Sequence, residues 1–211
     1  MQIRKKKTFA REELAFMQNG DLFDKKEDIT KRIQGLLEEL QASLKAHLKP
    51  EEFCAPEKTD FVHGHLVRGE RFLQRPYVYL DFPKFFSRQA MFTYRSFFWW
   101  GWDFVFAWIL SGPYLDLYKK NLINHFDRVA GMGFYLSLAS DPWEWRKASP
   151  DTLELAKQSP NEIQRLLAGK EFLKVQYFVG LDHPLWYEGG LVEEGIKIFD
   201  SLKFIVAKSS Y

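Results

Sequence analysis

The chain has 211 residues, of which 46% are hydrophobic and 27% charged, a balance typical of a folded globular protein and not of a disordered or collagen-like one. Its single cysteine, Cys54, excludes an internal disulfide bond and a cysteine-rich zinc site. The 30 basic and 28 acidic residues leave a net charge of +2, too small an excess to indicate nucleic acid or an anionic membrane as the partner.

The N-terminal quarter predicts two helices. A basic run occupies residues 4–7, and because no apolar block of signal-peptide length follows it, we expect a cytoplasmic protein. Residues 8–17 predict a short helix that is capped by Thr8 and ended by the sequence Asn19–Asp21. Residues 28–48 carry apolar side chains at spacings of three and four, which predicts a longer amphipathic helix. Pro50 and Pro56 then bracket a connection.

The middle of the chain is rich in aromatic residues, since 17 of the 36 lie between Phe61 and Trp108. This composition favours strands, which we expect at residues 77–82, where Pro83 stops the strand, and at residues 92–100 and 104–110. Gly101 supplies the turn of an antiparallel hairpin. The most apolar stretch, residues 97–110, is shorter than the roughly 20 residues of a transmembrane helix, so we expect no membrane span. Its near-continuous apolarity predicts that both strand faces are covered or that one lines a cavity.

The C-terminal half alternates helical and strand-like patterns. Pro113 begins a predicted helix that ends near Phe126, and residues 134–138 predict a strand against which residues 143–146 pair back. Two Ser-Pro steps predict helices at residues 151–157 and 160–168, followed by a strand at 172–179 and a helix at 191–206. The prediction is one α+β domain, with amphipathic helices packed on a mainly antiparallel sheet. Its parts are a helical segment at residues 8–48, a sheet-rich middle at 61–146, and a mixed part at 150–207.

No sequence fingerprint identifies a reaction or a cofactor. The chain lacks the phosphate-binding P-loop, the dinucleotide-binding glycine pattern, the Gly-x-Ser-x-Gly nucleophile turn and the His-Glu-x-x-His zinc motif.

An arginine and aromatic group is the strongest candidate for a site. Arginine pairs with carboxylate or phosphate through its fork and also stacks on aromatic rings, so this group predicts an organic, anionic ligand in a cleft. Alternation along a strand puts Trp99 and Trp100 on opposite faces, so at most one of them faces that cleft. The predicted ligand-binding residues are Arg71, Arg75, Tyr79, Arg95, Trp99, Trp100, Trp102 and Asp103.

A structural role for the same residues is the alternative. Arg75 and Arg95 can instead pair with Asp81 and Asp103 and support the sheet without touching a ligand. Asp103 itself can be an acid or base, or a turn residue close to solvent.

Two further functions stay open at this point. His63 and His65 point to the same side of an extended segment and predict a metal-assisted hydrolase or nuclease, provided that Asp60, Asp182 or His183 supplies a third ligand. Two surface histidines without a metal are the simpler interpretation. The third function is an interaction protein whose aromatic surface is covered by another subunit, for example in a homo-oligomer. A single-stranded nucleic-acid platform is disfavoured, because so dense an aromatic run belongs mostly to a core.

Overall fold

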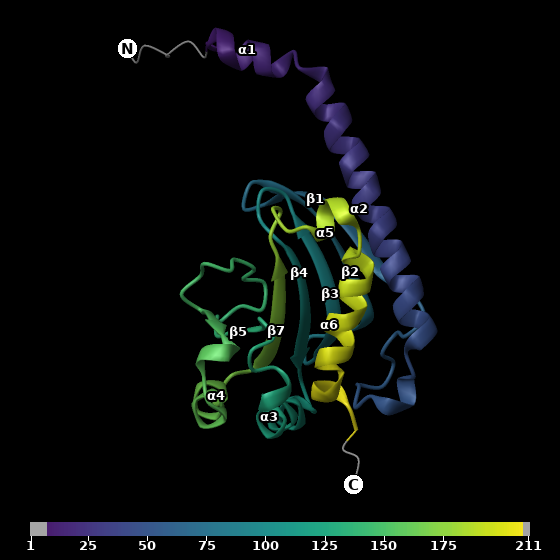
Figure 1. The fold of residues 1–211 in the computed structure, drawn as a ribbon, viewed down its shortest axis with the longest axis vertical. Helices are drawn as coiled ribbons and strands as arrows, with labels where there is room; N and C mark the ends of the chain where they lie inside the picture. The colour runs from purple at the N-terminus through teal and green to yellow at the C-terminus, as the bar shows by residue number, and fades with distance from the viewer. Residues whose placement is uncertain (1–7, 209–211) are drawn as a thin grey trace.

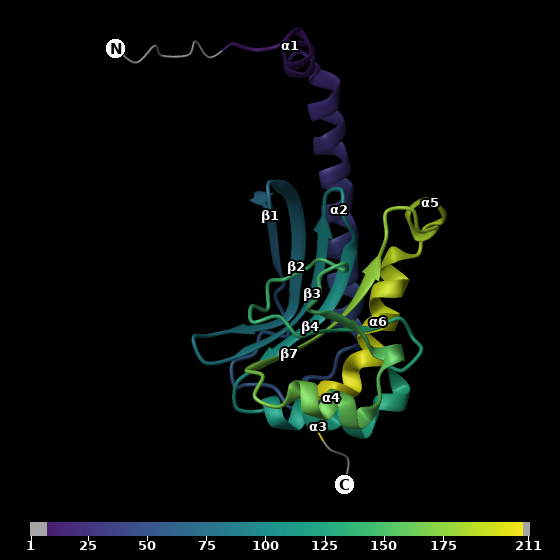
Figure 2. The same ribbon diagram turned by 90° about the vertical axis from the view of Figure 1, so that its left-hand side faces the viewer.

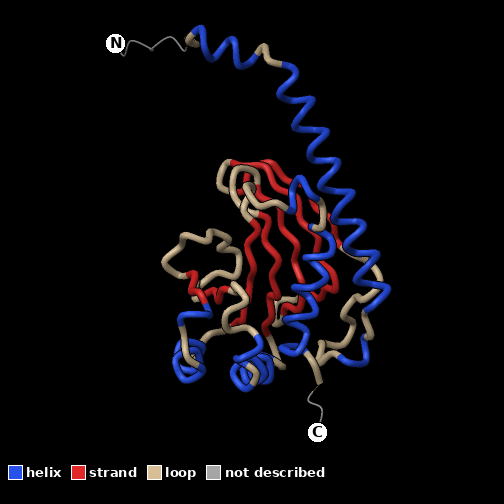
Figure 3. The backbone as a smooth tube through the Cα atoms, viewed as in Figure 1, coloured by secondary structure: helices blue, strands red, loops and turns tan. Residues whose placement is uncertain are grey.

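The computed structural model describes residues 8–208, and its centre is one seven-stranded antiparallel sheet (Figure 3). The strand order across the sheet is β1-β2-β3-β4-β7-β5-β6. The α+β class predicted from the sequence is confirmed. The strands are β1 (His65–Phe72), β2 (Arg75–Phe86), β3 (Met91–Trp99), β4 (Phe104–Ser111), β5 (Tyr135–Ser137), β6 (Thr152–Glu154) and β7 (Phe172–Val179).

Six α-helices accompany the sheet within the described residues. Figures 1 and 2 show α2 and α6 running along one side of the sheet, with α3 and α4 together at its lower end. The first part of α2 and all of α1 extend beyond the upper end of the sheet in both views. The helices are α1 (Arg11–Met17), α2 (Gly20–His47), α3 (Leu115–Asn124), α4 (Pro160–Leu167), α5 (Leu185–Glu188) and α6 (Leu191–Val206).

The sheet face that packs on α2 and α6, called the helix face, is apolar. Alternate residues of β3 and β4 point to it, among them Tyr94, Phe106 and Trp108, and they join the buried stripes of the two helices in one core. Gly195 permits the close approach of α6, because a Cβ at this position would lie 2.7 Å from the Phe106 ring. The Tyr94 hydroxyl donates a 2.8 Å hydrogen bond to the Gly195 carbonyl, so the polar atom of this buried ring is satisfied.

The opposite face, called the loop face, is covered differently. The remaining residues of β3, β4 and β7 point to it and form a second cluster, which includes Phe97, Trp99, Ile109 and Phe178. No helix contributes to this cluster within residues 8–208; Trp143 and Trp145 pack on it instead. Both tryptophans belong to the connection between β5 and β6, residues 138–151, which we call the covering loop.

Several element boundaries differ from the sequence-based expectation. Helix α2 begins at Gly20 and not near residue 28, because the Asn19 side chain caps it by accepting from the Leu22 amide at 3.3 Å. Strand β2 does not stop at Pro83 but continues to Phe86. Pro83 lies where the register of β2 with β3 shifts, between Asp81 and Lys84. At such an irregularity a strand tolerates a proline, which has no N–H donor.

Two predictions around the covering loop are wrong. Residues 151–157 are not an α-helix: Thr152–Glu154 form strand β6, and a short 3₁₀ turn follows. Residues 143–146 do not pair with β5, because β6 takes that edge through the pairs Ser137 with Thr152 and Tyr135 with Glu154. Pairing with an existing sheet edge therefore outweighed the local helical signal of the Ser-Pro step.

The apolar stretch at residues 97–110 forms the end of β3, its turn and most of β4. Within the part of the chain that the structure describes, no helix is long and apolar enough to cross a membrane.

Candidate functional site

A cleft of about 250 Å³ opens on the loop face. Strands β1, β2 and β3 supply its floor and one wall, and the covering loop supplies the other wall. All but one of its lining side chains are aromatic, which suits a flat organic molecule. The lining residues are Phe72, Tyr77, Tyr79, Arg95, Phe97, Trp143 and Trp145.

Strand alternation and register bring these side chains together. On β2, Tyr77, Tyr79 and Asp81 point to the same face, and the register pairs Tyr79 with Phe97 and Asp81 with Arg95 on β3. The rings of Tyr77 and Tyr79 stack with an interplanar angle of 5° and a centroid distance of 6.0 Å. The wall is thus built on rigid sheet positions and not on a loop.

Arg95 is the one charged residue among those that line the cleft, and Asp81 holds it in place. The Asp81 carboxylate accepts from Nε at 2.7 Å and from Nη2 at 2.6 Å, and the two side chains are only 1% and 8% exposed. The guanidinium carbon lies 3.8 Å from the Tyr79 ring centroid and 4.7 Å from that of Trp143. Within residues 8–208, no hydrogen bond engages Nη1, so this edge can still donate.

Lys174 on β7 is a second buried basic residue on this face. Its Nζ donates to the carbonyls of Pro142 at 3.1 Å and Glu144 at 2.5 Å, and it lies 3.4 Å from the Trp145 ring centroid. Burial, followed by the positive charge of Arg95, holds the pKa of Lys174 well below its usual range. The hydrogen bonds of Lys174 therefore hold the covering loop on the sheet. Because the site is buried, the protonated form of Lys174 is costly there.

Gln176, two residues along the same strand, is fully buried, yet neither its amide nitrogen nor its oxygen has a partner in the structure. The Ser137 hydroxyl on β5 is in the same state. Ala107 on β4 pairs with Arg95 of β3 on one side and with Gln176 of β7 on the other. The small alanine therefore separates the two polar side chains. Unsatisfied buried polar groups are rare, and they concentrate where a ligand or water completes the hydrogen bonding.

The structure brings only two of the predicted ligand residues, Tyr79 and Arg95, into the cleft. Trp99 lies behind the lining, donates from Nε1 to the Phe72 carbonyl at 3.1 Å, and stacks on Trp102 at 4.9 Å. Trp100 packs with the helix-face core, so Trp99 and Trp100 do lie on opposite sides of the sheet.

The other predicted residues lie elsewhere. Arg71 and Arg75 are exposed at the turn between β1 and β2, and neither makes an ion pair with any residue that the structure describes. Asp103 is partly buried in the turn between β3 and β4, and this burial raises the pKa of its carboxyl group. Of the ion pairs of Arg75 and Arg95 with Asp81 and Asp103 considered from the sequence, only Arg95 with Asp81 is present among the described residues.

The histidine pair has no metal-binding surroundings in residues 8–208, where no group of three or more His, Cys, Asp or Glu side chains is placed to hold a metal ion. The His63 side chain is 80% exposed, with Nδ1 3.5 Å from an Asp60 carboxylate oxygen. That carboxylate already accepts from the His63 amide at 2.8 Å and from Lys84 at 2.9 Å, and these bonds lower the pKa of Asp60 despite its partial burial. His65 begins β1 and packs edge-on against Tyr79.

Sequence reasoning missed Phe72, Phe97, Trp143 and Trp145 as lining residues. A signal for Phe97 was available, because it lies two residues from Arg95 and so shares its face of the strand. Trp143 and Trp145 are also two residues apart, but the sequence predicts that residues 143–146 pair with residues 134–138, on the other side of the sheet from β2. No local sequence pattern indicates that residues 143–145 lie over strands β2 and β3.

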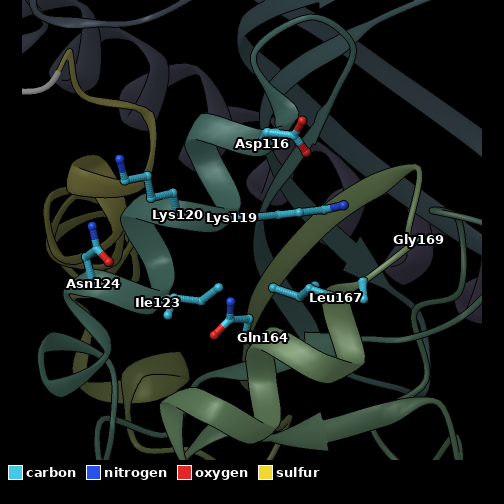
Figure 4. A pocket seen from close by; sticks show the side chains of 9 residues that line it. Asp116, Lys119, Lys120, Ile123, Asn124, Gln164, Leu167 and Gly169 are labelled. Atoms are coloured by element: carbon cyan, nitrogen blue, oxygen red, sulfur yellow. The ribbon is translucent and has the colours of Figure 1, made fainter.

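A larger hollow of about 590 Å³ lies between α3 and α4. Figure 4 shows Lys119 and Ile123 on one helix facing Gln164 and Leu167 on the other. It lacks aromatic residues and buried charge, and the amine of Lys119 is already bonded to the Lys170 carbonyl at 2.5 Å. We therefore regard the smaller aromatic cleft as the candidate site.

Comparison with known protein families finds no matching family model, and comparisons with curated proteins and with solved structures find no match either.

Proposed function

We propose that this protein binds a small, planar organic anion in the cleft on the loop face. One observation carries the proposal: a guanidinium group, fixed by a buried carboxylate and lying against aromatic rings, borders an open hollow of about 250 Å³. A hollow of this size accepts one or two fused rings.

The aromatic lining supports a flat ligand. Tyr77, Tyr79 and Phe97 present ring faces and edges from adjacent strands, and Trp143 closes the space from the covering loop. A ring inserted here gains about 0.5–1.5 kcal/mol for each well-placed aromatic contact, in addition to its loss of water-exposed area.

The two buried basic side chains support an anion. Asp81 neutralises Arg95, whereas Lys174, whose pKa burial lowers, has only backbone carbonyls and the Trp145 ring as partners. A carboxylate near Nη1 of Arg95 would add a charge-assisted hydrogen bond and would favour the protonated form of Lys174.

Titration of the full chain with naphthoate tests this proposal, with intrinsic tryptophan fluorescence and the melting temperature as readouts. We expect naphthoate to raise the melting temperature and to change the emission of Trp143 and Trp145, because binding to the native state alone stabilises it. Naphthamide has the same rings without the charge, and cyclohexanecarboxylate has the charge without the flat ring, so both should bind more weakly.

Two variants locate the binding. Tyr77→Ala removes a cleft wall and should weaken naphthoate binding about tenfold, equivalent to about 1.4 kcal/mol. Tyr187→Ala is the matched control, because Tyr187 is 73% exposed on α5 and does not line the cleft. Equal binding of naphthoate by both variants, or equal binding of naphthoate and naphthamide by the native protein, would contradict the proposal.

A further inference from the structure

The N-terminal arm, residues 8–25, has no cover from the rest of the described chain. Every one of its residues is exposed, and Figures 1 and 2 show α1 and the first turns of α2 standing clear of the sheet. Single exposed apolar residues are ordinary on a protein surface, but a group of this size marks a contact surface. Its six large apolar side chains are 40–63% exposed: Phe9, Leu14, Phe16, Met17, Leu22 and Phe23.

The apolar surface of the arm continues the buried stripe of α2. Thr30, Ile33 and Leu37 are buried on the sheet, and Phe23 lies seven residues, two helical turns, before Thr30. Because α2 is one continuous helix, its first turns are held in line with the covered part and cannot fold back on the sheet. The apolar stripe of α2 therefore extends beyond the sheet, and the apolar side chains in this extension are exposed.

The turn between β1 and β2, residues 71–75, lies at the same end of the molecule. The ion pairs of Lys26 with Glu70 and of Glu27 with Arg68 hold the end of β1 beside α2 just below the arm. We call residues 71–75 the tip. The tip exposes Leu73 at 58%, flanked by two arginines that make no ion pair with any described residue.

The arm and the tip are complementary in charge as well as in apolarity. Residues 8–25 contain two cationic and four acidic residues, a net charge of −2 that does not include the basic run at residues 4–7, whereas the tip contains Arg71 and Arg75 and no acidic residue. Each chain thus carries an acidic apolar arm and a basic apolar tip at one end, and a two-fold axis would let two chains satisfy both surfaces at once.

We propose that two copies of this chain form a symmetric dimer in which the arm of each copy packs on the tip of the other. Each copy contributes its arm and its tip, so a two-fold dimer contains two equivalent arm–tip contacts. Apolar side chains, with Phe16 and Met17 the most exposed in α1, form its centre, and the acidic and arginine side chains form its rim.

The dimer is tested first by measuring the molar mass of the full chain by light scattering after size exclusion. The native protein should have about twice the 25.0 kDa mass of the chain. The double variant Phe16→Asp/Met17→Asp should be monomeric, with dimer association weakened at least 100-fold, because it puts charge at the centre of the interface. Both positions are exposed within the monomer, so circular dichroism should show an intact fold.

Met132→Asp is the matched control, since Met132 is also exposed, at 43%, but lies outside the arm and the tip. It should leave the dimer unchanged. A native protein that stays monomeric at a concentration of 100 micromolar overturns the proposal, as does an arm variant that remains dimeric.

Charge reversal distinguishes arm-to-tip packing from arm-to-arm packing. Glu12→Lys/Asp24→Lys reverses charges on the arm, and Arg71→Glu/Arg75→Glu reverses those of the tip, so each variant alone should dimerise about tenfold more weakly. Mixed together, the two variants should form a heterodimer, because one arm–tip contact is then native and the other has both charges reversed. Tip variants that leave the dimer intact, or a mixture that stays monomeric, would show that the arm binds something other than the tip of a second copy.

Discussion

The two faces of the sheet are both buried, yet they achieve burial with different chemistry. On the helix face, α2 and α6 cover apolar residues, and the polar atom of Tyr94 is satisfied by a carbonyl. On the loop face, the covering loop lies over the buried Asp81, Arg95 and Lys174. Both faces hold buried polar atoms without a partner among the described residues, for example Trp108 Nε1 on the helix face and the Gln176 amide on the loop face, but only the loop face buries charged residues. Buried charge reduces stability, so a face built only for folding would not need it. This contrast is why we propose the loop face as the ligand-binding face.

Separating the buried ion pair should have the largest effect. We expect Arg95→Leu to lower the free energy of unfolding by about 3–5 kcal/mol, because the Asp81 carboxylate is then buried without its cation. Asp81→Leu/Arg95→Leu should recover most of that loss. Urea denaturation of the native protein, the two single variants Arg95→Leu and Asp81→Leu, and the double variant measures this coupling. On the helix face, Tyr94→Leu and Phe199→Leu should couple by no more than about 1.5 kcal/mol, and equal coupling on both faces would remove the distinction.

Lys174 should give the loop face a pH dependence that the helix face lacks. Its folded-state pKa is lowered, so between that pKa and the unfolded value near 10.5 the unfolded chain binds more protons. Stability therefore rises with pH in this window, by at most about 1.4 kcal/mol per pH unit for one group. Lys174→Met removes this rise. The measurement is the difference in unfolding free energy between native protein and variant from pH 7 to 9.5, and a constant difference would contradict the expectation.

Two glycine substitutions probe the tightness of the helix face. Gly195→Ala should cost about 1–2 kcal/mol, because the new Cβ would meet Phe106 at 2.7 Å and Leu40 at 3.0 Å, more than offsetting the better helix propensity of alanine. Gly35→Ala on the exposed side of α2 meets nothing within 4 Å and should stabilise by up to about 1 kcal/mol. Thermal unfolding of both variants gives the signs, and a stabilising Gly195→Ala would mean that α6 can move away.

The smallest expected change concerns Gln176. Gln176→Met keeps the volume but removes an amide without partners, so we expect it to stabilise the protein by about 1 kcal/mol. Thr93→Val on the same face should instead destabilise by a similar amount, since the Thr93 hydroxyl donates to Asp81 at 3.2 Å. If Gln176→Met also destabilises in denaturant titrations, the amide is satisfied in solution and the loop face is less unusual than we infer.

The strands and helices with strong patterns could be predicted closely. Residues 172–179 and 191–206 match β7 and α6, and the hairpin around Gly101 is correct because a positive φ of 72° at the turn suits glycine. The predictions failed where a local signal competed with sheet pairing, as at residues 151–157. For the site, alternation identified Tyr79 and Arg95 as candidates, but the same reasoning also included Arg71 and Arg75, which lie outside the cleft at an exposed turn.

The sequence by itself determined the α+β class, the two amphipathic helices that cover the sheet, and the aromatic strands, because periodicity and composition are local properties of the chain. Only the tertiary structure decided that Asp81 is the partner of Arg95, that Trp143 and Trp145 reach across to the cleft, and that α2 continues beyond the sheet. Each of these depends on strand register or on the path of a loop, which residues far apart in the chain set together.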